Sequence, residues 1–103
     1  MEMIRIPLEA LRISYGEHAS RSLAFGKAEL VVVTDYGDRH WYVDAEGIGD
    51  EELLRWFGRS EDIRVDVEAT DRNGRMLTGT GYLHPNEYHL AAAIRGDGEL
   101  AGL

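Results

Sequence analysis

Apolar and polar residues alternate most regularly between residues 62 and 95, in three runs that are separated by two turns. The alternation has the two-residue period of a strand with one buried face. The apolar positions of the three runs are Ile63, Val65, Val67 and Ala69, then Leu77, Gly79, Gly81 and Leu83, then Tyr88, Leu90, Ala92 and Ile94. This pattern predicts an antiparallel meander of three strands.

The first turn of the meander contains Asn73 and Gly74. A two-residue Asn-Gly loop would shift the pairing by one residue and would expose one apolar set, because such a shift moves every side chain to the opposite face. A three-residue loop over residues 72–74, with Gly74 left-handed, pairs Val67 with Gly79 and keeps the apolar sets together. We therefore predict the three-residue loop.

At the second turn, a two-residue connection at Pro85 and Asn86 keeps the apolar sets on one face. It predicts that Leu83 lies opposite Tyr88, and that His84 lies opposite Glu87.

The pattern of the N-terminal half predicts three strands, of which the second and third form a hairpin. Residues 3–8 alternate as a strand, a helical turn follows at residues 8–11, and residues 16–20, including His18, form a loop. A long second strand begins near Arg21, and its apolar parity changes at Gly26, which predicts a β-bulge there. A turn with Gly37 and Asp38 at its centre then predicts a hairpin in which Val32 lies opposite Val43.

A short helix is predicted after residue 50. Asp50 is a typical N-cap residue, two acidic residues follow where the helix dipole favours anions, and Gly58 is placed to end the helix. Its apolar stripe contains Leu53, Leu54 and Phe57.

The element order is three strands, one helix and three strands, within one domain of residues 1–103. We predict a mainly β fold, a small antiparallel β-barrel or sandwich with one short helix. In element order it resembles the OB-fold, in which a helix lies between the third and fourth strands. A turn is predicted at Gly96-Asp97-Gly98.

Composition narrows the functional classes. The chain contains 44% hydrophobic residues, enough for one core, and it has no cysteine, which excludes disulfides and thiolate chemistry. No apolar stretch approaches the roughly 20 residues of a membrane span, and no signal-peptide pattern begins the chain. The expectation is a cytoplasmic protein that makes no membrane contact.

The formal net charge of −8 disfavours nucleic acid, because phosphate backbones are bound mainly by lysine and arginine. Tyrosines that would suit base stacking are Tyr36, Tyr42, Tyr82 and Tyr88. Only one lysine, Lys27, is available to border such a platform. Binding of single-stranded nucleic acid is therefore the less favoured alternative.

Three residues near the second turn, His84, Glu87 and His89, are weak candidates for a metal site. In the predicted register they project from the outer face together with Tyr82, and imidazole and carboxylate groups bind zinc. Exposed polar pairs of this kind also occur on any solvated sheet, so we predict no bound cofactor.

The sequence contains no motif of a calcium-binding loop or of a catalytic serine. The acidic segment of residues 44–52 does not match the calcium-binding loop, and its last acids are explained by the start of the helix. Gly79 and Gly81 lie within a strand and are expected to leave room for large neighbours such as Trp41, Trp56 or Tyr88. No serine occurs in a G-x-S-x-G context, so no catalytic residue is assigned.

We therefore predict a non-enzymatic module for protein–protein interaction or self-assembly, acting through an outer β face or a sheet edge. The predicted interaction face contains Val31, Val33, Tyr42, Met76 and Tyr82. An acidic surface favours a basic partner. A barrel that binds a small ligand or a metal is the first alternative.

The segment of residues 77–103, about a quarter of the chain, has a glycine-rich strand, a hairpin and a Gly-Asp-Gly-Glu-Leu ending. In these features it resembles the end of phage tail-tube proteins. The resemblance implies a structural role in a phage-tail-like assembly.

Overall fold

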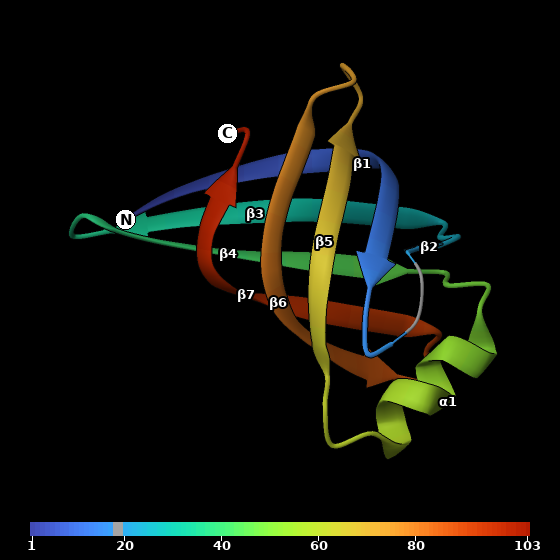
Figure 1. The fold of residues 1–103 in the computed structure, drawn as a ribbon. Coiled ribbons are helices and arrows are strands. Elements are labelled where there is room, and N and C mark those ends of the chain that lie inside the picture. The colour runs from blue at the N-terminus through green and yellow to red at the C-terminus, as the bar shows by residue number, and fades with distance from the viewer. Residues whose placement is uncertain (18–19) are drawn as a thin grey trace.

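The computed structural model describes residues 1–17 and 20–103, so that His18 of the predicted loop lies outside the described residues. The described chain forms seven strands and one helix (Figure 1). They are β1 (Glu2–Ser14), β2 (Arg21–Ser22), β3 (Lys27–Asp35), β4 (Asp38–Glu46), α1 (Glu51–Arg59), β5 (Arg64–Asp71), β6 (Met76–Asn86) and β7 (Ala91–Ala101). No helix in this part of the chain is long and apolar enough to cross a membrane.

The sheet closes into a six-stranded antiparallel barrel in the order β1-β3-β4-β7-β6-β5, with β2 as an additional strand beside β1. Closure depends on β1, whose first half pairs with β3 and whose second half pairs with β5. The mainly β fold and the predicted order of three strands, a helix and three strands are confirmed, with the two-residue β2 as an extra strand, and the barrel is the form that the protein adopts.

A bulge bends β1 between its two halves. The register with β5 shifts between Leu8 and Ala10, and the buried positions change from Ile6 and Leu8 to Leu11 and Ile13. An inserted residue bends a strand and strengthens its twist, which lets one strand serve two partners. The helical turn predicted at residues 8–11 is therefore wrong, because these residues continue the strand.

The long strand predicted around Gly26 is also wrong, because four residues separate β2 from β3. The amide of Gly26 donates hydrogen bonds to the carbonyl oxygens of Glu46 at 2.9 Å and Gly47 at 3.1 Å. A Cβ atom on Gly47, whose φ is +68°, would lie 3.0 Å from the nitrogen of Gly26. The glycines thus permit a close backbone approach at the end of β4.

The four predicted turns have different outcomes. The loop at residues 72–74 is confirmed, since Val67 pairs with Gly79 and Gly74 has a φ of +83°. The turn at Pro85 and Asn86 is wrong, because both residues belong to β6 and the chain turns at residues 87–90. Leu83 therefore pairs with Ile94 and not with Tyr88.

The hairpin between β3 and β4 turns one residue earlier than predicted, at Tyr36 and Gly37. Both have positive φ, 50° and 85°, as a type I′ turn requires. Val32 therefore pairs with Trp41, not with Val43. The turn predicted at residues 96–98 is wrong as well, since these residues lie in β7 beside an irregularity of its pairing with β6.

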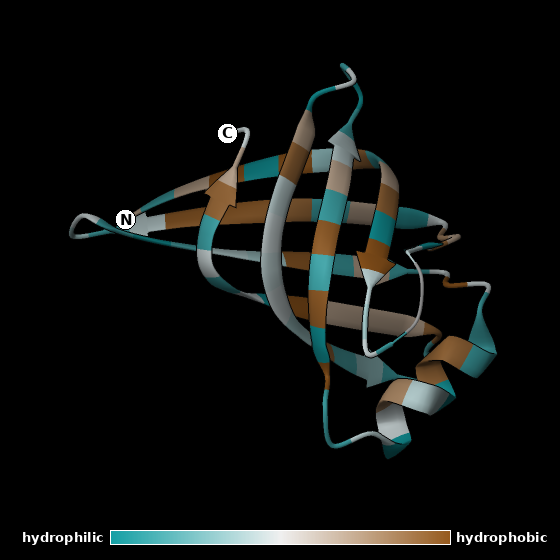
Figure 2. Cartoon of the chain, viewed as in Figure 1, coloured by the Kyte–Doolittle hydropathy of each residue, from teal (hydrophilic) through white to brown (hydrophobic). Residues whose placement is uncertain are grey.

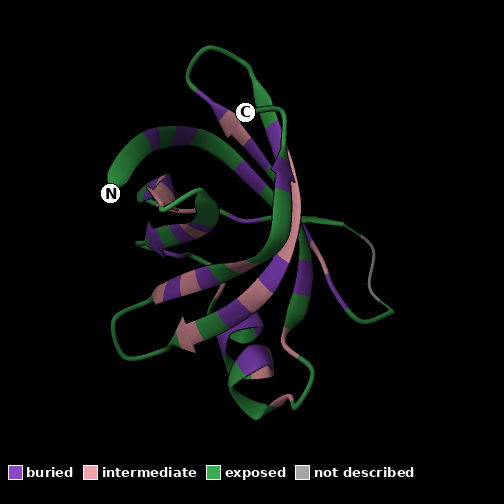
Figure 3. Ribbon diagram, turned by 90° about the vertical axis from the view of Figure 1, so that its left-hand side faces the viewer, coloured by how far each residue is buried: buried purple, intermediate pink, exposed green. Residues whose placement is uncertain are grey.

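The barrel encloses the apolar core, and α1 covers one of its ends (Figures 1 and 2). Buried residues alternate with more exposed ones along the strands, which Figure 3 shows as bands of different colour. Asp50 caps the helix by accepting a hydrogen bond from the amide of Leu53 at 3.1 Å, which confirms the predicted cap. Leu53, Leu54 and Phe57 are buried as predicted, whereas the helix continues through Gly58 to Arg59.

An ion pair holds β2 against the start of the helix. Nε of Arg21 lies 3.2 Å from Oδ2 of Asp50, and an Nη1 hydrogen of Arg21 is donated to the hydroxyl oxygen of Tyr15 at 3.2 Å. The hydrogen bond to Tyr15 and the charge of Asp50 raise the pKa of Arg21 above its usual value. The guanidinium therefore remains charged in this contact.

Asp71 stabilises the hairpin between β5 and β6 and is the buried charged residue of the described chain. Its Oδ1 accepts hydrogen bonds from the amides of Asn73 and Arg75, both at 2.9 Å, and its Oδ2 lies 3.3 Å from Nε of Arg75. The amide of Arg75 is the main cause that lowers the pKa of Asp71 below its usual value. The stabilisation by Asp71 is therefore expected to be complete at a pH above the ordinary pKa of an aspartate. It is expected to be lost as the pH falls through the lowered pKa of Asp71 in the folded protein.

Trp41 fills the barrel beneath two glycines. A Cβ atom at Gly79 would lie 2.6 Å from Cζ2 of Trp41, and the ring lies still closer to the corresponding position at Gly96. Nε1 of Trp41 donates a hydrogen bond to the carbonyl oxygen of Gly98 at 3.2 Å. The expectation that Gly79 leaves room for Trp41 is confirmed, and Gly96 is a second such residue.

A three-stranded arm extends from the barrel, where β1 and the hairpin of β3 and β4 reach past the neighbouring strands (Figure 1). Residues 2–7 of β1 pair only with β3, and so do residues 38–41 of β4. Both outer strands of the arm therefore present a free edge. Met1, Met3 and Ile4 lie at its end with 85%, 45% and 50% of their surface exposed.

Candidate functional site

One register row crosses the outer face of the whole barrel. Its members, in the order of the strands β1, β3, β4, β7, β6 and β5, are Arg5, Val31, Tyr42, Arg95, Tyr82 and Arg64. The side chains of directly opposite residues on one face of a sheet are within contact distance of each other. The row therefore combines three arginines with one valine and two tyrosines.

The predicted interaction face is assembled only in part. Tyr42 and Tyr82 lie in this row, one on each side of Arg95, and Val33 lies two residues along β3 from it; all three are half-buried. Met76 is exposed but lies six residues from Tyr82 along β6, a distance of about 20 Å. It therefore belongs to another part of the surface.

The prediction that Val31 belongs to the interaction face is wrong, because Val31 has no exposed surface. Its neighbours in the row are Arg5 and Tyr42, and Arg5 forms an ion pair of 2.6 Å with Glu29, two residues before Val31 on the same face. Longer side chains therefore flank the small valine in the register of the sheet. Val31 supports the face from beneath and is not available to a partner.

A groove follows β7 along the outer face, and we call it the β7 groove. Its floor is formed by Ala91 and Ala93, because the outward residues of β7 are small at these positions. The outward residues of β4 form one wall and those of β6 form the other. From Ala91 to Gly96 the groove is about 16 Å long, the length of about five extended residues.

The end of the β7 groove near Ala91 is the acidic section, with a volume of about 380 Å³. Asp44 and Glu46 on β4 and Glu29 on β3 line it together with Lys27. Glu29 is neutralised by Arg5, whereas neither Asp44 nor Glu46 belongs to an ion pair of the described residues. This end of the groove is therefore suited to a basic group.

The other end is the Arg95 section, with a volume of about 540 Å³. It shares His84 and Ala93 with the acidic section, so the two are continuous. Its lining residues are His40, Trp41, Tyr42, His84, Ala93, Arg95 and Gly96. No carboxylate is among them, although acidic residues outnumber basic residues by 19 to 11 in the chain.

Arg95 is exposed, and none of the ion pairs among the described residues includes it. The nearest acid along its own strand is Asp97, which lies 3.5 Å from Nη1 of Arg64 and accepts a hydrogen bond from the hydroxyl of Tyr82 at 3.3 Å. Asp97 is thus held by the neighbours of Arg95. The guanidinium of Arg95 remains for an external acceptor.

The predicted metal-site residues are not arranged as expected. His84 lies on β6 opposite Ala93 and lines the β7 groove, whereas Glu87 and His89 lie in the turn of residues 87–90. The amide of His89 donates to Oδ1 of Asn86 at 3.3 Å. Nowhere in the described parts of the chain do three or more histidine or acidic residues form a group that fits a metal ion.

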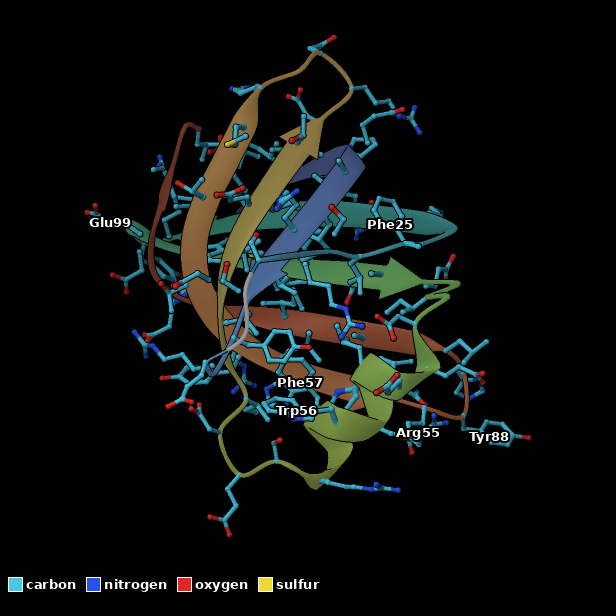
Figure 4. The ribbon with its side chains drawn as sticks, turned by 45° about the vertical axis from the view of Figure 1, so that its right-hand side comes forward. Phe25, Arg55, Trp56, Phe57, Tyr88 and Glu99 are labelled. Atoms are coloured by element: carbon cyan, nitrogen blue, oxygen red, sulfur yellow. The ribbon has the colours of Figure 1, made fainter. Side chains whose placement is uncertain are left out.

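The four tyrosines of the predicted stacking platform are separated as well. Tyr36 lies at the tip of the arm and Tyr88 at the turn before β7, near the opposite end of β4. Figure 4 shows Tyr88 pointing away from the barrel. Only Tyr42 and Tyr82 share a surface, and Arg95 lies between them.

Sequence analysis missed Arg95, His40 and the alanine floor as parts of one site. The signal was the position of Ala91 and Ala93 on the polar side of the last run, where small apolar residues leave a hollow between larger neighbours. The wrong turn at Pro85 concealed it, since only the true register places His84 beside Ala93. Comparisons with family models, curated proteins and solved structures found no match.

Proposed function

We propose that this protein is a non-enzymatic binding module that holds an extended segment of a partner protein in the β7 groove. The observation that supports the proposal is the alanine floor between two walls of larger side chains, over a length of about five extended residues. Because β7 is paired with β4 on one side and with β6 on the other, the contacts to the segment would come from the side chains that line the groove.

Charge indicates the character of the partner. The net charge of −8 attracts a basic protein and accelerates its encounter, and the acidic section places Asp44 and Glu46 where a lysine or arginine of the segment would lie. The partner is therefore expected to be basic overall.

Filling the groove tests this function. Ala93→Arg places a long side chain on the floor between the two sections, so affinity for a partner segment should fall by at least about tenfold. Peptides are first selected from a displayed library of random ten-residue segments with the wild-type protein, and their affinity is then measured by fluorescence anisotropy.

The matched control is Ala10→Arg. Ala10 is exposed on β1, where it pairs with Thr70 of β5, and β1 is three strands from β7 in either direction around the barrel. This variant should bind as the wild type does. Equal affinities for wild type and Ala93→Arg would exclude the groove as the binding surface.

A second candidate function is self-assembly through the arm. It is favoured by the free edges of β1 and β4, since unpaired strand edges add strands from other chains, and by the exposed Met1, Met3 and Ile4 beside them. A phage-tail-like structural role would use such an arm to join successive copies.

Sedimentation velocity separates self-assembly from hetero-association. If the arm joins copies, mass rises with concentration in the wild type and stays monomeric in Met3→Lys, because a charge on the arm opposes edge pairing. Met76→Lys is the control, since Met76 is similarly exposed, at 52%, and lies outside the arm. A wild type that remains monomeric at all concentrations would contradict self-assembly.

A further inference from the structure

We propose that the Arg95 section is a subsite for one acidic side chain, aspartate or glutamate, of the segment that the β7 groove binds. This inference rests on the proposed function and adds a residue-level specificity to it. It predicts that a basic partner nevertheless carries an acid at one defined position of its bound segment.

The first argument is the local reversal of charge. The chain is strongly acidic, yet the Arg95 section is lined by one arginine and two histidines and by no carboxylate. Arginine offers a planar fork of N–H donors that matches a carboxylate, and an imidazole has an N–H donor in either protonation state. The Arg95 section thus offers donors for a carboxylate, whereas the acidic section is lined by Glu29, Asp44 and Glu46.

The second argument is that the surrounding contacts leave Arg95 available. Arg64 contacts Asp97 at 3.5 Å and donates to the hydroxyl of Tyr82 at 3.2 Å, so the nearest carboxylate along the strand is already occupied. The ring of Tyr82 also lies 5.9 Å from the guanidinium carbon of Arg64. These contacts hold Tyr82, the neighbour of Arg95 on β6, in place before any ligand arrives.

The third argument concerns the strength of such a contact. Tyr42 is half-buried, lies beside Arg95 in the register row and lines the section together with Trp41 and Gly96. Aromatic walls exclude water once a ligand is bound, and a charge pair is worth more where it is partly withdrawn from solvent. A carboxylate here would gain more than on the open surface.

The fourth argument distinguishes a side chain from a C-terminal carboxylate. The Arg95 section does not close the groove, because His40, Trp41 and Gly96 also line a further cleft of about 780 Å³ between the arm and the last residues of β7. A bound segment has room to continue past Arg95. The acid is therefore expected within the segment and not at its end.

The test compares the wild type with Arg95→Gln in the peptide selection described above. Peptides selected by the wild type should share an aspartate or glutamate at one internal position. Replacing that acid by its amide should weaken binding about threefold to tenfold for the wild type and less than twofold for Arg95→Gln. Arg72→Gln is the matched control, since Arg72 is exposed in the loop between β5 and β6 and should behave as the wild type.

Each outcome is decisive. Selected peptides that lose affinity on Ala93→Arg but share no internal acid would overturn the subsite and leave the groove function standing. An equal loss on amide replacement in wild type and Arg95→Gln would overturn it too, as would an acid found only at the peptide C-terminus. Failure to select any peptide would overturn both proposals.

Discussion

Gly96→Ala should lower the free energy of unfolding by about 1–3 kcal/mol or more, because the added methyl group has no space. Its Cβ atom would overlap the ring of Trp41, with three ring atoms closer than normal van der Waals contact. The ring cannot move easily, since it is 97% buried and Nε1 is hydrogen-bonded to the carbonyl oxygen of Gly98. Urea denaturation followed by tryptophan fluorescence measures the loss and reports on the environment of the ring.

Gly58→Ala is the control for this substitution. Gly58 lies within α1, and no atom lies within 4 Å of the Cβ position there. Alanine is favoured over glycine in a helix, so this variant should gain up to about 1 kcal/mol. If Gly96→Ala were as stable as the wild type, the close packing of Trp41 against β7 would be wrong.

The fold could be predicted from the sequence because the alternation of apolar and polar residues determines which face of a strand is buried. This assignment of the buried face stays correct even where the predicted strand pairing is wrong. The predicted pairing of β3 with β4 differs from the observed pairing by an even number of residues. The same is true of the predicted pairing of β6 with β7. Even shifts keep the apolar residues of the strands on the core side. Leu83 therefore lies inside although it pairs with Ile94 and not with Tyr88. Tyr88 and Leu90, which were predicted on the same apolar face, lie in the turn instead and are exposed.

The bulge in β1 could not be recognised from the sequence. The apolar parity changes between Leu8 and Leu11, but Leu-Glu-Ala-Leu is equally a good helical turn, and local pattern alone does not choose between them. The choice depends on β5, which pairs with the second half of β1 from far along the chain. Such non-local pairing is absent from any local window of sequence.

The groove could not be predicted for a related reason. Its walls come from β4 and β6, which are adjacent to β7 only in the folded barrel, and its floor consists of alanines that carry no chemical signature. Arg95 is one of ten arginines, and its lack of an ion pair depends on where Arg64 and Asp97 meet. The sequence therefore predicts an outer β face but not which residues act on it.

Phe57→Ala should have the largest effect on stability, a loss of about 3–5 kcal/mol. Phe57 is 2% exposed, and its ring centroid lies 4.8 Å from that of Tyr15 and 4.9 Å from that of Trp56. Figure 4 shows Phe57 and Trp56 between the helix and the barrel. A helix of nine residues is not stable alone, so this contact holds α1 in place.

Two measurements examine that role. Urea denaturation gives the loss in free energy, and hydrogen exchange shows whether the amides of α1 lose protection before those of β6, as expected when a helix detaches from the end of a barrel. Arg55→Ala is the control, because Arg55 is exposed on the same helix and should change stability by less than about 0.5 kcal/mol. If Phe57→Ala cost no more than Arg55→Ala, the helix would not be closing the barrel, and the core would have to end at the strands themselves.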